Sequence, residues 1–176
     1  MKCDQNTATQ FFNAFAKPDT VWTFQTFDDS ANKRDELISV RAGTIQKHFQ
    51  DLEDLNNDGA GVFVTVNEQT NPRKRSKTNT NRVRALFTDL DGAPLASEWQ
   101  LEPSMIVESS AGRYHVYWIC SDIPLEEFEP FQRVLAKVYG GDPVVCDLPR
   151  VMRVPGFVHQ KAEPFLSTII HAPGYQ

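Results

Sequence analysis

The sequence predicts a single α+β domain with a largely antiparallel sheet, and three observations support this class. The chain has 176 residues, the size of one ordinary domain. Strand-like and helix-like segments interleave along it, and two strand-like segments are close enough to form a hairpin. Its content of 40% hydrophobic and 23% charged residues is that of a globular protein rather than a disordered one.

The first half of the chain contains two helix-like and two strand-like segments. A short helix is expected over residues 6–15, capped by its first or second residue. Alternating polar and β-branched or aromatic residues predict a strand over 20–27. Apolar residues at helical spacing predict a helix over 44–55, and an apolar run predicts a strand over 61–67.

The second half begins with a strand expected over residues 83–90. Strand-like segments at 105–110 and 113–120, separated by Ala-Gly, predict a hairpin. Further short strands are expected over 144–147, 150–154 and 167–170. A helix is expected from Pro124 to Tyr139, ended by Gly-Gly, with its buried side formed by Leu125, Phe128, Phe131, Leu135 and Val138.

By itself the net charge of −5 argues against a nucleic-acid partner, but the charge is unevenly distributed. Residues 1–71 and 85–176 are both acidic, whereas residues 72–84 contain no acid. A local cationic cluster attracts a polyanion whatever the net charge, so this basic segment is a candidate phosphate-binding arm. The alternative is a solvated loop without a partner. Its basic residues are Arg73, Lys74, Arg75, Lys77, Arg82 and Arg84.

Two acidic residues follow the strand expected over 83–90. Asp89 and Asp91 are two positions apart, so on an extended strand both carboxylates point to one face, with Cα atoms roughly 6.5–7 Å apart. Two like charges there repel unless a cation neutralises them, which favours a divalent-metal site. The alternative is a polar turn, since Asp-Gly is a common turn dipeptide.

Asp147 ends the apolar segment expected to form a strand over 144–147. With Asp89 and Asp91 it would complete a three-carboxylate cage for hard cations such as Mg²⁺ or Mn²⁺. A strand-end cap is the alternative. Asp142, within Gly-Gly-Asp-Pro, is explained by a turn.

The hairpin supplies hydrogen-bond donors and positive charge. Period-two alternation places Arg113, His115 and Tyr117 on one face of the second strand, suited to a polar site, and the intervening residues on a core face. The small-residue turn before it adds hydroxyls and backbone N–H groups. Such donors are what a triphosphate needs, and they come from Ser109, Ser110, Gly112, Arg113 and His115.

A third cluster lies near the C-terminus. Arg150 and Arg153 have opposite strand parity, so both face one site only if the strand bends, as Val-Pro-Gly at 154–156 suggests. Lys161 lies beyond the bend and adds a further cation. His159 has no visible partner and is interpreted as a surface residue.

In this order the motifs resemble the archaeo-eukaryotic primase superfamily, specifically the primase-polymerases of plasmids, phages and mobile elements. The family's Asp-x-Asp motif is matched by residues 89–91, its small-residue turn and histidine by 109–115, and its later acid by Asp147. The Arg-x-x-Arg-x-Pro-Gly sequence from Arg150, with the later Lys161, resembles the plasmid-replication branch. The resemblance covers about residues 55–165.

The resemblance implies a DNA primase-polymerase that adds nucleotides to a 3′-hydroxyl or makes the primer. It implies a catalytic domain over 1–176, with an N-terminal α/β unit (about 1–80) beside an RRM-like unit (about 81–176). Two Mg²⁺ or Mn²⁺ ions would be held by Asp89, Asp91 and Asp147. The substrates would be dNTPs or NTPs and a single-stranded or primed DNA template. Many members also need a helicase or a helical accessory domain, which we expect this chain to lack.

The same resemblance assigns the binding residues. Nucleotide phosphates would contact Ser109, Ser110, Gly112, Arg113, His115, Arg150, Arg153 and Lys161. The template would contact the basic segment of residues 72–84.

Two other functions fit parts of the sequence. LFTDLDGAPL at 86–95 also resembles the first motif of haloacid-dehalogenase-type phosphatases, which need a parallel, doubly wound sheet. A non-catalytic RRM-like nucleic-acid-binding module is the other, although RNA-recognition sheets display aromatic residues where this site carries Asp, Arg and His.

The sequence also predicts the cellular setting. No apolar run approaches the roughly 20 residues that cross a bilayer, and the start lacks signal-peptide features. The three cysteines lack metal-ligand spacing. We therefore expect a cytoplasmic protein with reduced thiols and no membrane partner.

Overall fold

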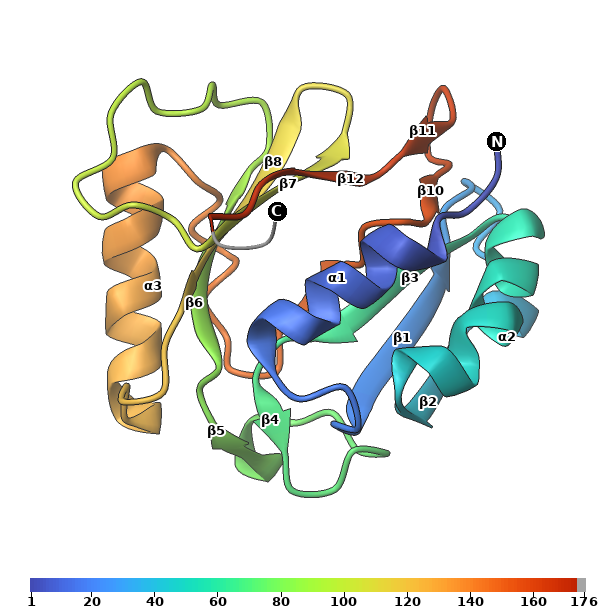
Figure 1. Ribbon diagram of the computed structural model, residues 1–176, viewed down its shortest axis with the longest axis horizontal. Coiled ribbons are helices and arrows are strands. Elements are labelled where there is room, and N and C mark those ends of the chain that lie inside the picture. Colours follow the sequence, from blue (N-terminus) through green and yellow to red (C-terminus); the bar gives the residue numbers. More distant parts are fainter. Residues whose placement is uncertain (174–176) are drawn as a thin grey trace.

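The computed structural model describes residues 1–173, which form two four-stranded antiparallel sheets and three α-helices (Figure 1). The first sheet has the order β2–β1–β3–β9, with strands Ser39–Gly43, Trp22–Asp28, Ala60–Thr65 and Val151–Arg153. The second has the order β12–β7–β8–β6, with strands Thr168–His171, Met105–Ser110, Arg113–Ile119 and Ala85–Leu90. The helices are α1 (Gln5–Phe15), α2 (Ile45–Asn57) and α3 (Leu125–Tyr139). Two short pairs complete the strands: β4 (Glu68–Gln69) with β5 (Thr80–Arg82), and β10 (Val158–His159) with β11 (Phe165–Leu166).

This topology confirms the α+β class with antiparallel sheets. It contradicts the phosphatase alternative, because β6, which carries Asp89, pairs antiparallel with β8 at the edge of its sheet. β9 comes late in the chain yet pairs with β3, so a strand from the second half completes the N-terminal sheet.

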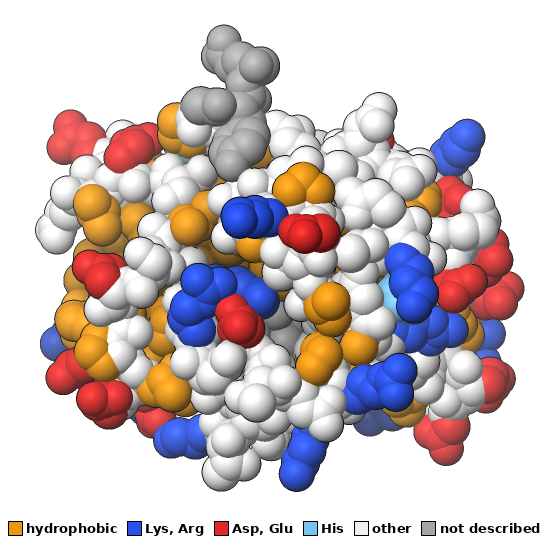
Figure 2. Space-filling model, turned by 60° about the horizontal axis from the view of Figure 1, so that its bottom comes forward, with side chains coloured by type: hydrophobic (Ala, Val, Ile, Leu, Met, Phe, Trp, Pro, Cys, Tyr) orange, Lys and Arg blue, Asp and Glu red, His pale blue; other side chains and the backbone are white. Residues whose placement is uncertain are grey.

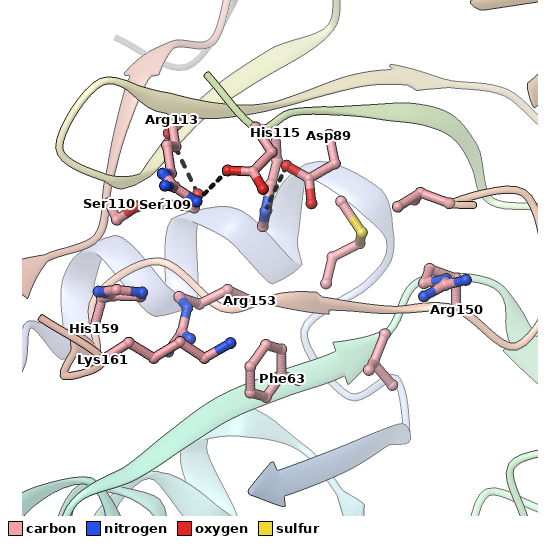
Figure 3. Close-up of a pocket in the computed structure, with 14 residues that line it drawn as sticks. Phe63, Asp89, Ser109, Ser110, Arg113, His115, Arg150, Arg153, His159 and Lys161 are labelled. Carbon is pink, nitrogen blue, oxygen red and sulfur yellow. Dashed lines mark hydrogen bonds and ion pairs between the residues drawn. The ribbon is translucent and has the colours of Figure 1, made fainter. Parts of the chain in front are cut away.

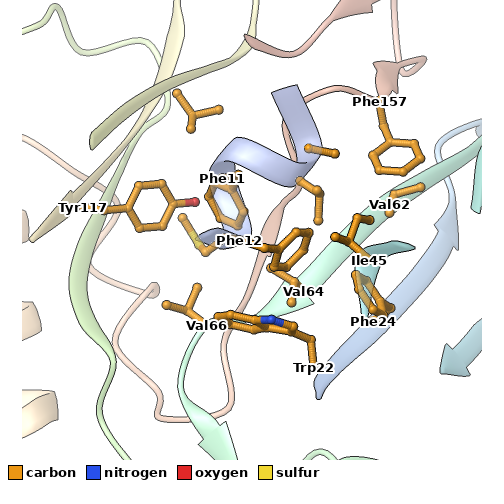
Figure 4. Close-up of a cluster of buried hydrophobic side chains, with 14 of the residues drawn as sticks. Phe11, Phe12, Trp22, Phe24, Ile45, Val62, Val64, Val66, Tyr117 and Phe157 are labelled. Atoms are coloured by element: carbon orange, nitrogen blue, oxygen red, sulfur yellow. The ribbon is translucent and has the colours of Figure 1, made fainter. Parts of the chain in front are cut away.

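Helix α1 holds the two sheets together. Phe11 of α1 lies 5.7 Å from Tyr117 of β8, and Phe12 lies 5.0 Å from Trp22 of β1, measured between ring centroids (Figure 4). All four side chains are buried in one apolar cluster that joins both sheets. Truncating one of these aromatic side chains would cost about 3–5 kcal/mol. The relative position of the sheets, and of any site between them, is therefore fixed by the core.

Local sequence explains where the first two helices begin. The side chain of Asp4 caps α1 by accepting from the N–H groups of Asn6 and Thr7, so the cap precedes the residues expected for it. The hydroxyl of Thr44 caps α2 by accepting from Lys47 N–H. Gly59, at φ +109°, follows the end of α2 and leads into β3.

Helix α3 covers the open edge of β6, on the left in Figure 1. Buried Gln132 accepts from the N–H of Phe87 at 2.9 Å and donates to the carbonyl of Val145 at 3.2 Å, which satisfies backbone groups that the sheet leaves unpaired. Phe128 is buried as expected, but Phe131 and Val138 are exposed. The expected face was wrong at these two positions because the helix turns its polar Gln132 towards the strand edge.

The expected strand over 144–147 was also wrong, since these residues form a turn and its continuation. Gly141 makes the turn possible, because a Cβ there would lie 1.9 Å from Thr88 Oγ1. Asp142 N–H then donates to the carbonyl of Asp89 at 2.9 Å. Within residues 1–173 no helix has the length and apolar character of a transmembrane span. Cys3, Cys120 and Cys146 are free thiols.

Candidate active site

A cavity of about 200 Å³ lies between the two sheets. Figure 3 shows one wall carrying Asp89, His115 and Arg113, from β6 and β8, and the facing wall carrying Phe63 and Arg153, from β3 and β9. Nine of the residues expected at the site line it: Asp89, Asp91, Ser109, Ser110, Arg113, His115, Arg150, Arg153 and Lys161. Gly112 and Asp147 do not line it.

Asp89 and His115 are directly opposite each other in the pairing of β6 with β8, and His115 Nε2 lies 3.8 Å from Asp89 Oδ1. Burial raises the pKa of Asp89 to about 6, with further contributions from the carboxylates of Asp91 and Asp142. The nearby guanidinium groups only partly offset this shift. The site thus disfavours the ionised form of Asp89, and a bound cation would relieve this penalty.

His115 is buried, and burial, reinforced by the charge of Arg153, lowers its pKa to about 3. The imidazole is therefore neutral at physiological pH and can donate one hydrogen bond. Its Nδ1 lies 3.4 Å from the hydroxyl of Tyr117, which is itself in the core rather than on the polar site expected from strand alternation.

The hairpin turn is held by its own contacts. Gly112, at φ +70°, donates its N–H to Glu108 Oε1 at 2.9 Å, so that amide is already hydrogen-bonded within the turn. The Ser109 hydroxyl donates to the carbonyl of Arg113. The guanidinium of Arg113 forms an ion pair with Asp91. Arg113 thus places a positive charge beside the Asp-x-Asp pair.

Asp147 does not line the cavity, but it is ion-paired with a residue that does. Its carboxylate pairs with Arg150, which does line the cavity and which also donates to the carbonyl of Val144. Among residues 1–173, no group of three or more His, Cys, Asp or Glu side chains is arranged to hold a metal ion. Asp89 and Asp91 offer the hard oxygen donors that suit Mg²⁺ or Mn²⁺, and the crowding of carboxylates at Asp89 fits such an ion.

Arg153 is buried and forms a bidentate ion pair with Asp29, with Nη1–Oδ2 at 2.9 Å and Nη2–Oδ1 at 3.0 Å. Gly61 makes room for this pair, because a Cβ there would lie 2.5 Å from Asp29 Oδ1. Arg150 lies just before β9, whereas Arg153 belongs to it. The alternation of side chains along a strand therefore does not force the two arginines onto opposite faces. Both line the cavity.

Lys161 and His159 line the wall that carries Arg153 (Figure 3). No carboxylate within the described residues 1–173 is ion-paired with Lys161, so its charge is available to a ligand. The interpretation of His159 as a surface residue was wrong: it is half-buried and lines the cavity. Burial, followed by the charge of Arg153, lowers its pKa. Its position two residues before Lys161 was the signal that could have indicated this.

The side chains of the basic segment differ in whether they form ion pairs with carboxylates. Arg73, Lys74 and Arg75 are exposed, and within residues 1–173 none of them is ion-paired with a carboxylate. Lys77 pairs with Glu129 at 3.6 Å, and Arg82 pairs with Glu68 at 2.8 Å. With the β4–β5 end turned towards the viewer, Figure 2 shows Lys and Arg side chains in separate groups across this face.

Arg84 differs from the rest of the segment. It is buried, its guanidinium lies 4.2 Å from the ring centroid of Trp22, and burial lowers its pKa to about 10. The structure thus gives Arg84 a packing role at the base of the segment, in place of the surface position that its expected template contact needs.

Comparisons with known proteins give a family match and a shared fold. The family model of the RepB DNA-primase N-terminal domain matches residues 28–172. A replication protein of Clostridium perfringens is 24% identical over an alignment of 152 residues, and the match covers 73% of this chain and 37% of that protein. The chain thus spans little more than a third of the length of this curated relative.

Two solved structures share the fold. The AEP domain of the primase-polymerase of cyanophage S-2L matches with a TM-score of 0.77 and 18% identity, over 99% of this chain and 93% of that one. The catalytic domain of primase RepB′ in complex with initiator DNA matches with a TM-score of 0.69 and 18% identity, over 97% of this chain and 85% of that one.

Proposed function

Because the chain belongs to the RepB DNA-primase N-terminal domain family, we propose that it adds nucleotides to a 3′-hydroxyl, or makes the primer itself, under the direction of a DNA template. The reaction would use two divalent cations and would serve the replication of a plasmid, a phage or another mobile element. Both dNTPs and NTPs are candidate substrates.

The observation that supports this proposal is that carboxylates and a free cationic side chain face each other across one cavity. Asp89 and Asp91 lie on one wall, where burial and the neighbouring carboxylates raise the pKa of Asp89. Lys161 lies on the facing wall without a carboxylate partner in the part of the chain that the structure describes. A complex of divalent cations with a nucleoside triphosphate would neutralise both walls at once.

Each side chain then has a defined task. Asp89 and Asp91 would hold the cations, and Asp147 would join them once Arg150 transfers its contact to the substrate. When bound, the cations would supply Lewis acidity to the attacking hydroxyl and the leaving pyrophosphate. The phosphates would be bound by the residues expected from the sequence: Ser109, Ser110, Gly112, Arg113, His115, Arg150, Arg153 and Lys161. Neutral His115 would act as a hydrogen-bond donor rather than as a cation.

Two of these residues act under constraints. The amide of Gly112 is already bonded to Glu108, so its contribution would be to shape the turn. Both terminal nitrogens of Arg153 bind Asp29, which also balances its charge, so Arg153 would mainly hold in place the wall that carries Lys161.

Single-stranded or primed DNA would approach along the basic segment. Arg75 links that segment to the site, because its Nη1 donates to the carbonyl of Pro149, next to Arg150, at 3.4 Å. A helicase or a helical accessory domain would be the protein partner of this catalytic domain.

The decisive experiment is incorporation of labelled nucleotide on a primed single-stranded template with Mg²⁺ or Mn²⁺, using dNTPs and NTPs in parallel. We expect incorporation by the wild type and none by the double variant Asp89→Asn, Asp91→Asn. Asp122→Asn, an exposed acid outside the cavity, is the matched control and should behave as the wild type. Equal incorporation by wild type and double variant would exclude catalysis at this site and leave a nucleic-acid-binding module.

A further inference from the structure

The β2–β1–β3–β9 sheet has two different faces. The face towards α1 and α2 is apolar and belongs to the core, which includes Phe24 and Val64. On the opposite face, residues that are directly paired on neighbouring strands form one row across the whole sheet. The row runs through Val40, Gln25, Phe63 and Arg153.

This outer face carries two aromatic rings that the core does not use. Phe27 lies two residues from Gln25 on β1, and its ring centroid is 5.6 Å from that of Phe63, with the planes at 65°. Both side chains are partly exposed. The guanidinium of Arg153 lies 4.6 Å from the ring of Phe63 and is fixed there by Asp29. The ring of Phe63 is therefore held in place rather than free to rotate into solvent.

Apolar surface continues along the same face. Val40 is 46% exposed, and Ile38, just before β2, is 48% exposed. Since Phe63 also lines the catalytic cavity, this strip begins at the cavity and leads away from it.

Positive charge borders the strip. The hydroxyl of Thr23, on the same face of β1, donates to the carbonyl of Pro72 at 2.7 Å, so the basic segment starts against this face. At the other border lie Arg153 and Lys161 (Figure 3). Aromatic rings flanked by cations are how proteins bind single-stranded nucleic acid, because every base has a face that stacks.

We propose that Phe27 and Phe63 form a stacking platform for bases of the single-stranded DNA template next to the catalytic cavity. The proposal deepens the proposed function and rests on it, because it takes the strand to be the template. The bases would stack on the aromatic strip while the phosphates follow the basic segment.

Binding of a fluorescent oligothymidylate, with an abasic strand of equal length for comparison, tests the platform at several salt concentrations. Phe27→Leu and Phe63→Leu should each weaken binding of the oligothymidylate by roughly 5-fold or more, within the range of roughly 5- to 150-fold that loss of a stacked base corresponds to. The preference for the base-bearing strand should shrink, and the salt dependence should stay as in the wild type, because no phosphate contact is lost. Phe63→Tyr, which keeps the ring, should restore binding. Phe131→Leu, at a 41% exposed phenylalanine of α3, is the matched control.

Several outcomes would overturn the platform. Unchanged binding by both leucine variants would do so, as would equal losses on the two strands. A loss of nucleoside-triphosphate affinity in calorimetry, without a loss of strand affinity, would assign Phe63 to the incoming nucleotide instead. If the wild type shows the base-dependent binding but incorporates no nucleotide, the platform stands and the proposed function fails.

Discussion

Asp29 and Arg153 form a buried, bidentate ion pair between the end of β1 and β9, across 124 positions of the sequence. Asp29 Oδ2 also accepts from the N–H of Gln160 at 3.1 Å. One carboxylate thus fixes the strand that crosses into the N-terminal sheet and the segment that leads to Lys161. The wall of the cavity that carries positive charge depends on this contact.

Removing one partner of this pair should destabilise the protein strongly. Asp29→Leu or Arg153→Met leaves a buried charge without its counter-ion, which costs about 3–5 kcal/mol of unfolding free energy. The double variant Asp29→Leu, Arg153→Met should lose less than the two single losses added together, because no charge is left unpaired. Urea denaturation of the four proteins measures this. Additive losses would contradict a coupled pair.

Substitutions of Asp147 and of Asp142 should differ in their effect on nucleotide incorporation. We expect Asp147→Asn to reduce incorporation by at least the roughly 10- to 100-fold that follows loss of a carboxylate supporting a metal site. Asp142→Asn should stay closer to the wild type, because Asp142 bonds Asp89 through its backbone N–H, while its side chain caps the turn at Val144 N–H and affects Asp89 only through its charge. Steady-state incorporation at saturating Mn²⁺ compares the two variants. A severe defect in Asp142→Asn with an active Asp147→Asn would exchange their roles.

Local patterns predicted most of the elements that carry the site. Strand periodicity placed Asp89 and Asp91 at the end of one strand and His115 on the second strand of a hairpin, and the β7–β8 hairpin is confirmed. The pairing of β6 with β8, which brings Asp89 opposite His115, is not part of that hairpin and was not predicted.

Long-range contacts could not be predicted in this way. Nothing in the pattern around residue 151 indicates that β9 pairs with β3, and this pairing is what brings Phe63 and Arg153 to the cavity. The face of α3 was misassigned at Phe131 for a similar reason, because Gln132 satisfies the edge of β6, a requirement visible only in the folded molecule. The sequence places Arg84 in the basic segment, but its packing on Trp22 is another long-range contact that the local pattern does not indicate.

In the absence of metal, the titration of His115 and that of Asp89 should change the free energy of unfolding with pH in opposite directions. Burial holds the pKa of His115 at about 3, below the usual 6.5, so the unfolded chain binds a proton that the folded chain lacks, and stability falls as the pH drops from 6.5 towards 3. The pKa of Asp89 is raised from 3.8 to about 6, so the folded chain keeps the extra proton and gains stability as the pH drops through 6 towards 3.8. Each effect has a maximal slope of about 1.4 kcal/mol per pH unit.

The two effects can be separated by substitution. Denaturant midpoints in a chelator across this pH range should fall less steeply for His115→Gln than for the wild type, and more steeply for Asp89→Asn. Parallel curves for the three proteins would show that neither group titrates as its burial requires.

The salt dependence of template binding should identify the phosphate contacts. Each phosphate contact to a single strand contributes about 0.7 to the slope of log affinity against log salt, so Arg73→Ala, Lys74→Ala, Arg75→Ala together should reduce the slope by about 2. Lys77→Ala and Arg82→Ala should have smaller effects, because Glu129 and Glu68 already neutralise these side chains. Lys137→Ala, an exposed lysine of α3, is the control for net charge and should leave the slope unchanged. A triple variant with the slope of the wild type would remove the basic segment from the template path, whatever its effect on affinity at one salt concentration.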